Sequence, residues 1–300
     1  SYDQFSSAWQ LRFKDTAPQP QGIAMCISEE DVVKCILWAN KNKIPFVARS
    51  GGHSYAAYSN SSGLIIHLSK MNKMKLDVVT NELVLEGGAK NKDVFKYCKP
   101  FNRVITHGRC LEVGVSGLVL GGGIGFDMRH NGYTCDKLIE TRIILADGSI
   151  LACNELENSD LFWACRGAGG GNFGIHTSFT FQTFEVGNIT VFDLKWINKI
   201  EELFVKIQDI VINSDNKLGL KFSVVVENED GQNKLSLKLL GQWLGTKSEF
   251  DNLIAPVLLI EEPTQSVVYE TNYWEGQDFI SVEGEKEYSH ERSNFISGQL

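Results

Sequence analysis

Glycine is concentrated in three blocks of the first part of the chain, and this pattern constrains the fold more than any other feature. The blocks are Arg49–Ser54, Gly114–Gly125 and Gly167–Gly174. Glycine lets a backbone bend sharply and lets a ligand approach without meeting a Cβ atom. Successive free N–H groups can then point at anionic oxygens, which makes such loops suitable for a diphosphate. The blocks therefore indicate either a nucleotide-type cofactor held by several loops or a glycine-rich structural scaffold.

The two common nucleotide-binding motifs do not account for these blocks. A formal G-x-G-x-x-G occurs at Gly169, Gly171 and Gly174, but in a Rossmann fold it should open a helix. Residues 175–184 after it have the alternating pattern of a strand. A Walker loop is excluded because no Gly-Lys-Ser/Thr follows any block.

Local patterns before residue 187 predict alternating helices and strands. Ser28 is a typical N-cap, followed by acidic residues and then by apolar residues at helical spacing, so a helix is expected to about Asn42. The Asp147-Gly148 pair between two β-rich runs predicts a hairpin over residues 138–153. Ser159 can cap another helix, in which Trp163, like Phe173 further on, is expected to pack against the glycine loops. Further strands are expected at 46–49, 63–68, 83–86 and 175–184, with a short helix at 93–98.

The pattern changes near Gly187, after which regular strands and helices return. We therefore predict a domain boundary there, with domains over residues 1–187 and 188–300. In the second domain, Trp196 and Trp243 fall on expected strands, where substrate stacking and core packing are both open. Strands are expected at 189–196, 220–226 and 235–243, a helix at 198–212, and a turn at 229–231.

Composition excludes several classes of function. The formal net charge of −8 and the lack of a Lys/Arg cluster argue against a nucleic-acid partner. No apolar run is long enough to span a bilayer, so no membrane segment is expected. The seven cysteines contain no C-x-x-C pair, which argues against a zinc site and leaves either several buried thiols or one reactive thiol. The chain begins at Ser1, so either a leader has been removed or the chain has been shortened.

Taken together and in order, the blocks resemble the FAD-linked oxidases of the vanillyl-alcohol oxidase type (PCMH-type FAD-binding domain), and specifically the berberine-bridge-enzyme-like branch. Residues 49–54 are similar to the pyrophosphate loop whose histidine bonds to the flavin 8α-methyl group. Gly108-Arg109-Cys110, followed by residues 113–117, is similar to the segment whose cysteine bonds to flavin C6. The family order continues through residues 121–125, 129, 132, 136, 146–148, 160–163 and 170–175. The resemblance is close over residues 1–187 and looser afterwards.

The resemblance implies a fold and a cofactor. The expected α+β fold is a two-subdomain FAD-binding domain followed by an α+β substrate domain, with an antiparallel sheet and helices, that is incomplete at its C-terminus. The expected cofactor is FAD, bound covalently by His53 and Cys110, with no metal. The other cofactor-binding residues that it implies are Arg49, Ser50, Gly51, Gly52, Ser54, Val113, Gly114, Gly117, Gly122, Gly123, Gly125, Gly174 and Ile175.

Several positions depart from the family pattern. Leu111 stands where many doubly linked members have Pro, which leaves the neighbouring thiol in place. Leu118 stands where plant members commonly have His, which favours bacterial or fungal relatives. Family members are usually longer, and their later residues usually supply the catalytic base. That base is therefore expected beyond Leu300, in a missing segment or a second chain.

The function implied by the resemblance is an oxidase that takes a hydride from an alcohol, such as that of a carbohydrate, and passes the electrons to dioxygen to give hydrogen peroxide. Val113 occupies a position at which valine accompanies oxygen reactivity in relatives. The partners would be a small-molecule or oligosaccharide substrate and dioxygen. A tailoring oxidase of a bulky secondary metabolite and a flavin-binding protein without turnover are the alternatives. The compartment, secreted or cytoplasmic, stays open.

The remaining histidines have two interpretations each. His67 lies in an apolar strand and is expected to be a hydrogen-bonded structural residue, and His107 is expected to be structural although it is close to Cys110. His130 and His176 either line a cavity or pack as buried polar groups. His290 lies in a charged stretch and is expected to be exposed.

Overall fold

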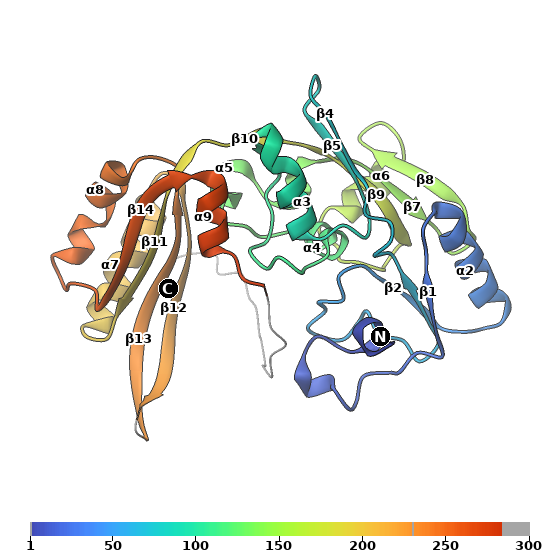
Figure 1. Ribbon diagram of the computed structural model, residues 1–300, viewed down its shortest axis with the longest axis horizontal. Coiled ribbons are helices and arrows are strands. Elements are labelled where there is room, and N and C mark those ends of the chain that lie inside the picture. Colours follow the sequence, from blue (N-terminus) through green and yellow to red (C-terminus); the bar gives the residue numbers. More distant parts are fainter. Residues whose placement is uncertain (1, 230, 284–300) are drawn as a thin grey trace.

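The computed structural model describes residues 2–229 and 231–283, and these form two parts that lie next to each other (Figure 1). The N-terminal part, up to about residue 187, begins with a short helix α1 (Tyr2–Ser6) and contains a parallel and an antiparallel sheet. The C-terminal part contains another antiparallel sheet. His290 and the turn residue Asp230 lie outside the described residues.

The parallel sheet carries the first glycine block. Strands β1 (Gly22–Met25) and β2 (Phe46–Arg49) both pair with the central strand β3 (Leu64–His67). Helix α2 (Glu29–Lys41) buries Val32, Ile36 and Ala39 in a cluster with residues of β3. The hydroxyl of Ser28 accepts a hydrogen bond from the Asp31 N–H, so the predicted N-cap is confirmed. Because β2 ends at Arg49, the block begins at the carboxyl end of this sheet.

The antiparallel sheet of the N-terminal part has five strands in the order β4-β5-β9-β7-β8. Its predicted hairpin between β7 and β8 is confirmed, and Gly148 in the turn has a φ of +85°. Strand β9 follows the third glycine block directly, which confirms a strand rather than a Rossmann helix there. The strands are β4 (Met74–Asp77), β5 (Glu82–Glu86), β7 (Leu138–Ile144), β8 (Ile150–Asn154) and β9 (Ile175–Gln182).

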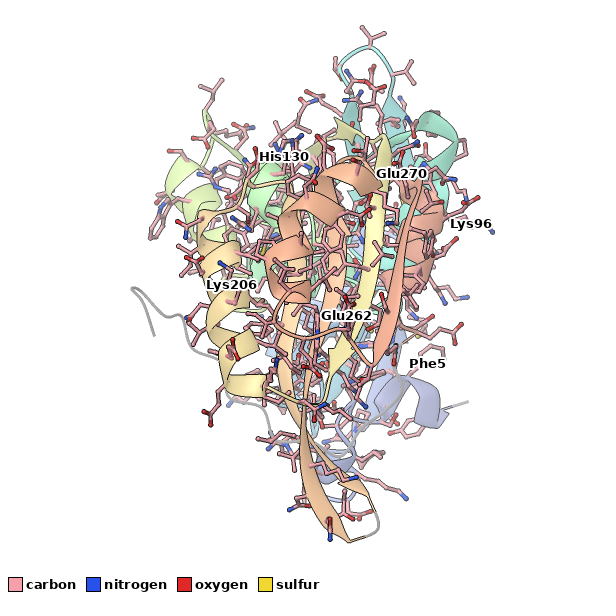
Figure 2. The ribbon with its side chains drawn as sticks, turned by 90° about the vertical axis from the view of Figure 1, so that its left-hand side faces the viewer. Phe5, Lys96, His130, Lys206, Glu262 and Glu270 are labelled. Carbon is pink, nitrogen blue, oxygen red and sulfur yellow. The ribbon has the colours of Figure 1, made fainter. Side chains whose placement is uncertain are left out.

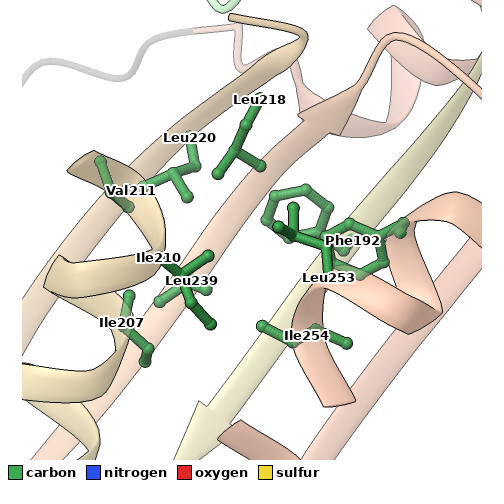
Figure 3. Close-up of a pocket in the computed structure, with 10 residues that line it drawn as sticks. Phe192, Ile207, Ile210, Val211, Leu218, Leu220, Leu239, Leu253 and Ile254 are labelled. Carbon is green, nitrogen blue, oxygen red and sulfur yellow. The ribbon is translucent and has the colours of Figure 1, made fainter. Parts of the chain in front are cut away.

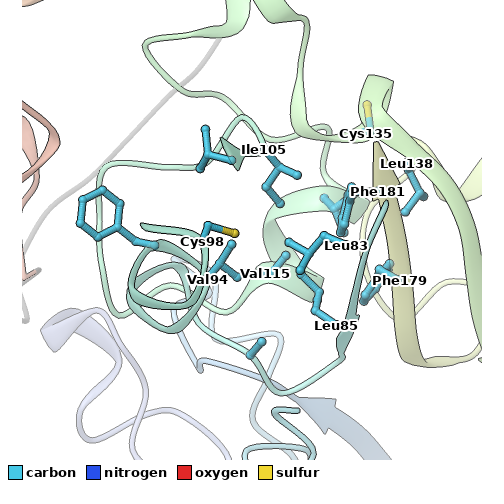
Figure 4. Close-up of a cluster of buried hydrophobic side chains, with 14 of the residues drawn as sticks. Leu83, Leu85, Val94, Cys98, Ile105, Val115, Cys135, Leu138, Phe179 and Phe181 are labelled. Atoms are coloured by element: carbon cyan, nitrogen blue, oxygen red, sulfur yellow. The ribbon is translucent and has the colours of Figure 1, made fainter. Parts of the chain in front are cut away.

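Short helices cover one face of this sheet. Helix α3 (Asn91–Cys98) and helix α4 (Val115–Leu120) contribute Val94, Cys98 and Val115 to a buried cluster with Leu83 and Phe181 (Figure 4). This packing holds the start of α4, and therefore the second glycine block, against the sheet. The other short elements here are α5 (Met128–Asn131), α6 (Ser159–Cys165), and the paired strands β6 (Arg103–Val104) and β10 (Phe184–Glu185).

The C-terminal part is a four-stranded antiparallel sheet covered on one face by helices α7 (Ile200–Asn213) and α8 (Lys247–Leu258) (Figure 2). Apolar residues of both helices meet Phe192 and Leu239 of the sheet (Figure 3). The space left between them is only about 10 Å³, so this is packed core rather than a ligand pocket. The strands, in spatial order, are β12 (Leu218–Glu229), β13 (Gln232–Trp243), β11 (Asn188–Trp196) and β14 (Gln265–Asn272).

Helix α9 (Tyr273–Ile280) lies between the two parts (Figure 1). Tyr273, Trp274 and Ile280 are buried in the same cluster as residues of α3, β5 and β9. Ile189 and Val191 at the start of β11 belong to that cluster as well. The two parts therefore share a core, and the domain boundary near Gly187 stays a prediction.

The sequence patterns missed several elements. Strands β1 and β4 are only four residues long, and β1 also lacks an alternation of buried and exposed side chains. Helix α8 contains Pro256, which is a poor residue for a helix interior. Strand β14 and helix α9 were not predicted either. In the part of the chain that the structure describes, no helix is long and apolar enough to cross a membrane. The same residues include no cluster of three His, Cys, Asp or Glu side chains suited to a metal ion.

Candidate active site

The first glycine block turns the chain from strand β2 into His53. Arg49 is buried, and it donates to neutral acceptors, among them the Ser7 carbonyl oxygen at 2.8 Å and the Asn60 Oδ1 at 3.3 Å. Gly52 has a φ of +76°, and a Cβ atom there would lie 2.5 Å from the guanidinium of Arg49. The imidazole of His53 stacks on the indole of Trp9, with ring centroids 3.6 Å apart. A buried cation and a glycine turn therefore fix the backbone from which His53 projects.

The first and second glycine blocks touch through their backbones. A Cβ atom on Gly51 would lie 2.3 Å from the backbone nitrogen of Gly114. A Cβ atom on Gly114 would lie 2.4 Å from the backbone nitrogen of Gly51. The hydroxyl of Ser50 donates to the Gly87 carbonyl oxygen at 2.8 Å, which anchors the first block to the end of β5. Glycine at both crossing positions is therefore a requirement of packing.

Cys110 lies at this crossing, beside His53. Its Sγ atom is 4.0 Å from Nδ1 of His53, and both side chains are half-buried. Burial raises the pKa of the Cys110 thiol, so the protonated thiol is favoured at neutral pH. All seven cysteines are free thiols, and five of them are buried: Cys26, Cys98, Cys135, Cys153 and Cys165. The buried-thiol interpretation holds for those five, whereas Cys110 is placed beside the predicted attachment residue.

The segment around Cys110 is held by the start of helix α3. The side-chain amide of Asn91 donates to the carbonyl oxygens of Cys110 at 2.9 Å and Gly108 at 3.2 Å. The backbone N–H of Asn91 donates to the Val113 carbonyl oxygen, and the next N–H donates to that of Leu111, both at 3.0 Å. These four bonds fix the backbone on both sides of the thiol.

The predicted glycines fall into two groups. A Cβ atom built on Gly117 or Gly122 meets nothing within 4 Å, and Gly122 also has a φ of +102°. A Cβ atom on Gly125 would instead lie 2.4 Å from the His107 carbonyl oxygen, and one on Gly174 would lie 2.4 Å from that of Ile144. The first group faces open space, as a ligand cradle requires, and the second allows close packing of the protein itself. Gly123 belongs to the second group because it lies against Thr134, and Ile175 has its side chain in the core near α2.

These features fit an anionic dinucleotide that receives two protein bonds. Arg49 supplies a buried positive charge beside the first block. Two buried side-chain atoms near Cys110, Nη1 of Arg109 and Oδ1 of Asn91, have no hydrogen-bond partner among the described residues. Unsatisfied buried polar atoms are rare in folded proteins and mark places where a ligand or water completes the bonding. The open glycines and the adjacent His53 and Cys110 supply the rest of the site.

Comparison with known proteins identifies the cofactor class. The family model for an FAD binding domain matches residues 20–154, which include the first two glycine blocks, His53 and Cys110. The chain carries an FAD-binding domain. This FAD-binding domain explains why the glycine loops follow neither the Rossmann nor the Walker pattern, and it confirms the cofactor expected from the resemblance.

The similarity extends beyond the FAD-binding domain. An uncharacterised FAD-linked oxidoreductase of Bacillus subtilis is 32% identical over 273 residues, which cover 88% of this chain and 59% of that protein. A xylooligosaccharide oxidase of Thermothelomyces thermophilus is 31% identical over 283 residues, covering 91% of this chain and 56% of that protein. The chain thus spans a little more than half the length of these curated relatives.

A solved structure supports the fold. Glucooligosaccharide oxidase from Acremonium strictum, which carries a 6-S-cysteinyl, 8α-N1-histidyl FAD, matches with a TM-score of 0.80 and 28% identity. The match covers 93% of this chain and 58% of that structure. The resemblance to the vanillyl-alcohol oxidase type and its berberine-bridge-enzyme-like branch is thereby confirmed, as is the α+β fold class.

Several side chains singled out in the sequence have structural roles. Trp163 is 75% exposed on the outside of the short helix α6, so the prediction that it packs against the glycine loops is wrong. Phe173 is 42% exposed, and its packing stays a prediction. Trp196 and Trp243 are buried in the core under α7 and α8, which decides against a stacking role for either. His130 is exposed. His67 is a buried strand residue, as predicted, and accepts a hydrogen bond from the N–H of Ser69.

His176 forms a buried chain with Thr141 and Cys165. The Thr141 hydroxyl lies 2.8 Å from Nδ1 of the imidazole, and the thiol of Cys165 lies 3.7 Å from Nε2. Burial lowers the pKa of His176 to about 4 and raises that of Cys165 to about 11. Both side chains are therefore neutral, and none of the three is more than 5% exposed. This is a packed polar group rather than a nucleophile and base.

Trp9, Asn91 and Val282 are site residues that the sequence did not reveal. Trp9 stacks on His53, Asn91 holds the Cys110 backbone, and Val282 pairs with that backbone from the other side. None lies in a glycine block or a recognisable motif, so each becomes visible only through its contacts. The catalytic base expected after Leu300 lies outside the described residues.

Proposed function

We propose that this protein is an FAD-dependent oxidase in which the flavin is bonded to His53 at its 8α-methyl group and to Cys110 at C6. The observation that carries the proposal is the 4.0 Å separation of Nδ1 of His53 and Sγ of Cys110. Both flavin positions lie on one benzenoid ring, so the two attachment atoms have to be neighbours. The Acremonium relative has the same pair of linkages, which supports the assignment.

The chain's own residues hold and orient the cofactor. The open faces of Gly117 and Gly122, together with the buried charge of Arg49, suit the diphosphate and its ribityl chain. Trp9 fixes the plane of the His53 imidazole. When bound, FAD accepts a hydride from a substrate CH–OH carbon and transfers the electrons to dioxygen, giving a carbonyl product and hydrogen peroxide.

The substrate we propose is the CH–OH group of a carbohydrate, with an oligosaccharide as the first candidate. Relatives named as xylooligosaccharide and glucooligosaccharide oxidases support this class. We also propose that residues 188–300 belong to the substrate domain. The sheet of this region presents one face to α7 and α8, and α9 joins it to the FAD-binding domain.

Acid precipitation tests the attachment. Flavin should precipitate with the wild-type protein and with both single variants, His53→Ala and Cys110→Ala, because one bond suffices to retain it. It should appear in the supernatant only for the double variant. Release of all flavin from the folded wild type would refute covalent attachment, and release from His53→Ala alone would refute the Cys110 bond.

A peroxide assay over mono- and oligosaccharides tests the reaction. We expect hydrogen peroxide to form in proportion to oxidised sugar. Flavin that is reduced by a sugar but is not reoxidised by air would identify a dehydrogenase instead. A flavin that no sugar reduces would refute the proposed substrate class.

A further inference from the structure

Helix α9 is tied to the FAD-binding domain by a chain of buried polar side chains. The hydroxyl oxygen of Tyr273 lies 2.7 Å from Oδ2 of Asp127 and 3.2 Å from Nε2 of His107, within hydrogen-bonding distance of both. The other oxygen of Asp127 accepts from the side-chain amide of Gln242, whose own oxygen accepts from Gln277 of α9 at 2.6 Å. All five side chains are at most 4% exposed. These hydrogen-bonded side chains therefore join α9 and β13 to the segment that leads into Cys110.

Asp127, Tyr273 and His107 can share their protons in two arrangements. His107 Nδ1 lies 3.2 Å from the Gly108 carbonyl oxygen, an acceptor, so Nδ1 carries a proton. If Asp127 is ionised, Tyr273 donates to it and accepts from Nε2 of His107. If Asp127 is protonated, its carboxyl group donates to the Tyr273 oxygen, and the Tyr273 hydroxyl donates to Nε2 of a neutral His107. The same contacts are then satisfied. Burial raises the pKa of Asp127 and lowers that of His107, which favours the second, uncharged arrangement. In both, the Tyr273 hydroxyl is the one side-chain group among the described residues that links the carboxyl group to the imidazole.

The segment that follows α9 pairs with the backbone around Cys110. Val282 is the second residue after the helix; its N–H donates to the Arg109 carbonyl oxygen, and the N–H of Leu111 donates to that of Val282, both at 2.9 Å. Cys110 and Val282 thus form a parallel bridge. The first residue of α9 contacts His107, and Val282, two residues after the helix, is paired with Cys110, so α9 and the residues after it span the segment between them.

From these contacts we infer that α9 places the Cys110 thiol for its bond to the flavin, and that Tyr273 is the positioning residue that sets α9 against His107. The inference rests on the proposed attachment of flavin to Cys110. Formation of the S–C6 bond replaces one S–H and one C–H bond, and the two electrons and two protons released pass through the flavin to dioxygen, which leaves as hydrogen peroxide. The His53 loop is held by Trp9, Ser7 and Asn60 of the N-terminal part. Attachment at Cys110 therefore depends on α9, and attachment at His53 does not.

Tyr273→Phe removes the hydroxyl and keeps the ring in the core. In the flavin-loaded protein, free Cys110 is measured by iodoacetamide labelling after denaturation, and the flavin on the His53 peptide is measured by mass spectrometry. We expect a large rise in labelled Cys110 with undiminished flavin on His53. Tyr97→Phe is the matched control, because the Tyr97 hydroxyl takes part in a partly buried hydrogen bond, which it accepts from the N–H of Leu76 at 3.1 Å.

Val282→Pro tests the other end of α9. Proline removes the N–H that donates to the Arg109 carbonyl oxygen. The extended backbone of Ser281, with ψ of 158°, is compatible with a following proline. Val282→Ala keeps the N–H and shortens only the side chain. We expect labelled Cys110 to rise in Val282→Pro and to stay at the wild-type level in Val282→Ala.

The outcomes separate this inference from the proposed function. Wild-type protein with Cys110 fully labelled refutes the Cys110 bond and the inference with it. Wild-type protein with both bonds, together with unlabelled Cys110 in Tyr273→Phe and Val282→Pro, overturns the inference alone. Equal loss of both bonds in these variants also overturns it, because α9 would then support the whole fold rather than the Cys110 segment.

Discussion

Gly51 and Gly114 cross so closely that neither position has room for a Cβ atom, and this crossing brings His53 to Cys110. A Cβ atom on Gly51 would lie 2.3 Å from the backbone nitrogen of Gly114. His53 and Cys110 are 57 residues apart in sequence, and each lies a few residues from the crossing, His53 after Gly51 and Cys110 before Gly114. Nδ1 of His53 and Sγ of Cys110 are 4.0 Å apart. The pair of attachment residues is therefore assembled by backbone contact between two glycines.

Gly51→Ala should push the two loops apart. The Cβ atom meets rigid backbone, so we expect a loss of stability of about 1–3 kcal/mol, as for other overpacked sites, and a fall in covalently bound flavin. Urea unfolding and acid precipitation measure the two effects. Gly187→Ala is the control, because nothing lies within 4 Å of a Cβ atom there. Normal flavin attachment in Gly51→Ala would contradict this account of the crossing.

Gly117→Ala should separate stability from cofactor binding. Gly117 lies within helix α4 and faces open space, so alanine should leave the flavin-free protein as stable or raise its stability by up to about 1 kcal/mol. If that space holds the cofactor, the added methyl group should lower flavin content. Thermal unfolding of flavin-free protein and the ratio of flavin to protein absorbance measure both. Full flavin content in a stable variant would mean that Gly117 does not face the cofactor.

Trp9→Ala should slow attachment at His53. The indole stacks on the imidazole with a ring separation of 3.6 Å, and such stacking contributes roughly 0.5–1.5 kcal/mol. In a Cys110→Ala background, where only His53 can retain flavin, the rate at which added FAD becomes acid-precipitable should fall. Trp9→Phe should restore part of the rate. An unchanged rate in Trp9→Ala would show that the stack does not orient His53.

His176 should make stability depend on pH. Its folded-state pKa is lowered by burial to about 4, below the ordinary value of 6.5, so the folded state favours the neutral imidazole. The stability that comes from keeping this imidazole neutral is complete above pH 6.5 and is lost as the pH falls from 6.5 to about 4. Below pH 4 it does not change further. Between pH 7 and pH 5 the loss is on the order of 2 kcal/mol.

The pH dependence of unfolding in urea measures this effect. His176→Gln should flatten the dependence between pH 7 and pH 5, and His130→Gln, at an exposed position, should not. Buried His67, whose pKa is also lowered to about 4, should retain its own share of the dependence in both variants. An equal slope in wild type and His176→Gln would contradict the assignment.

Much of the N-terminal part could be predicted because its signals are local. Ser28 caps its helix, Asp147-Gly148 turns its hairpin, and Ile175 begins a strand, each through the conformation of a few neighbouring residues. Trp163 was misplaced for the same reason, since an aromatic residue beside a glycine run has no local signal for which way it points. Helix α9 was not predicted, and its contacts with residues far away in sequence became visible only in the structure.

The sequence by itself determined that several glycine loops would suit either a nucleotide cofactor or a structural scaffold, because positive φ angles and missing Cβ atoms are properties of single residues. The family resemblance then favoured FAD. Its family motifs also singled out His53 and Cys110. Only the tertiary structure decided that these two side chains meet, that Asn91 and Val282 hold the thiol in place, and that Tyr273 ties this segment to the rest of the chain. The physical reason is that such contacts join distant segments, and packing of the shared core, rather than any local propensity, sets which segments meet.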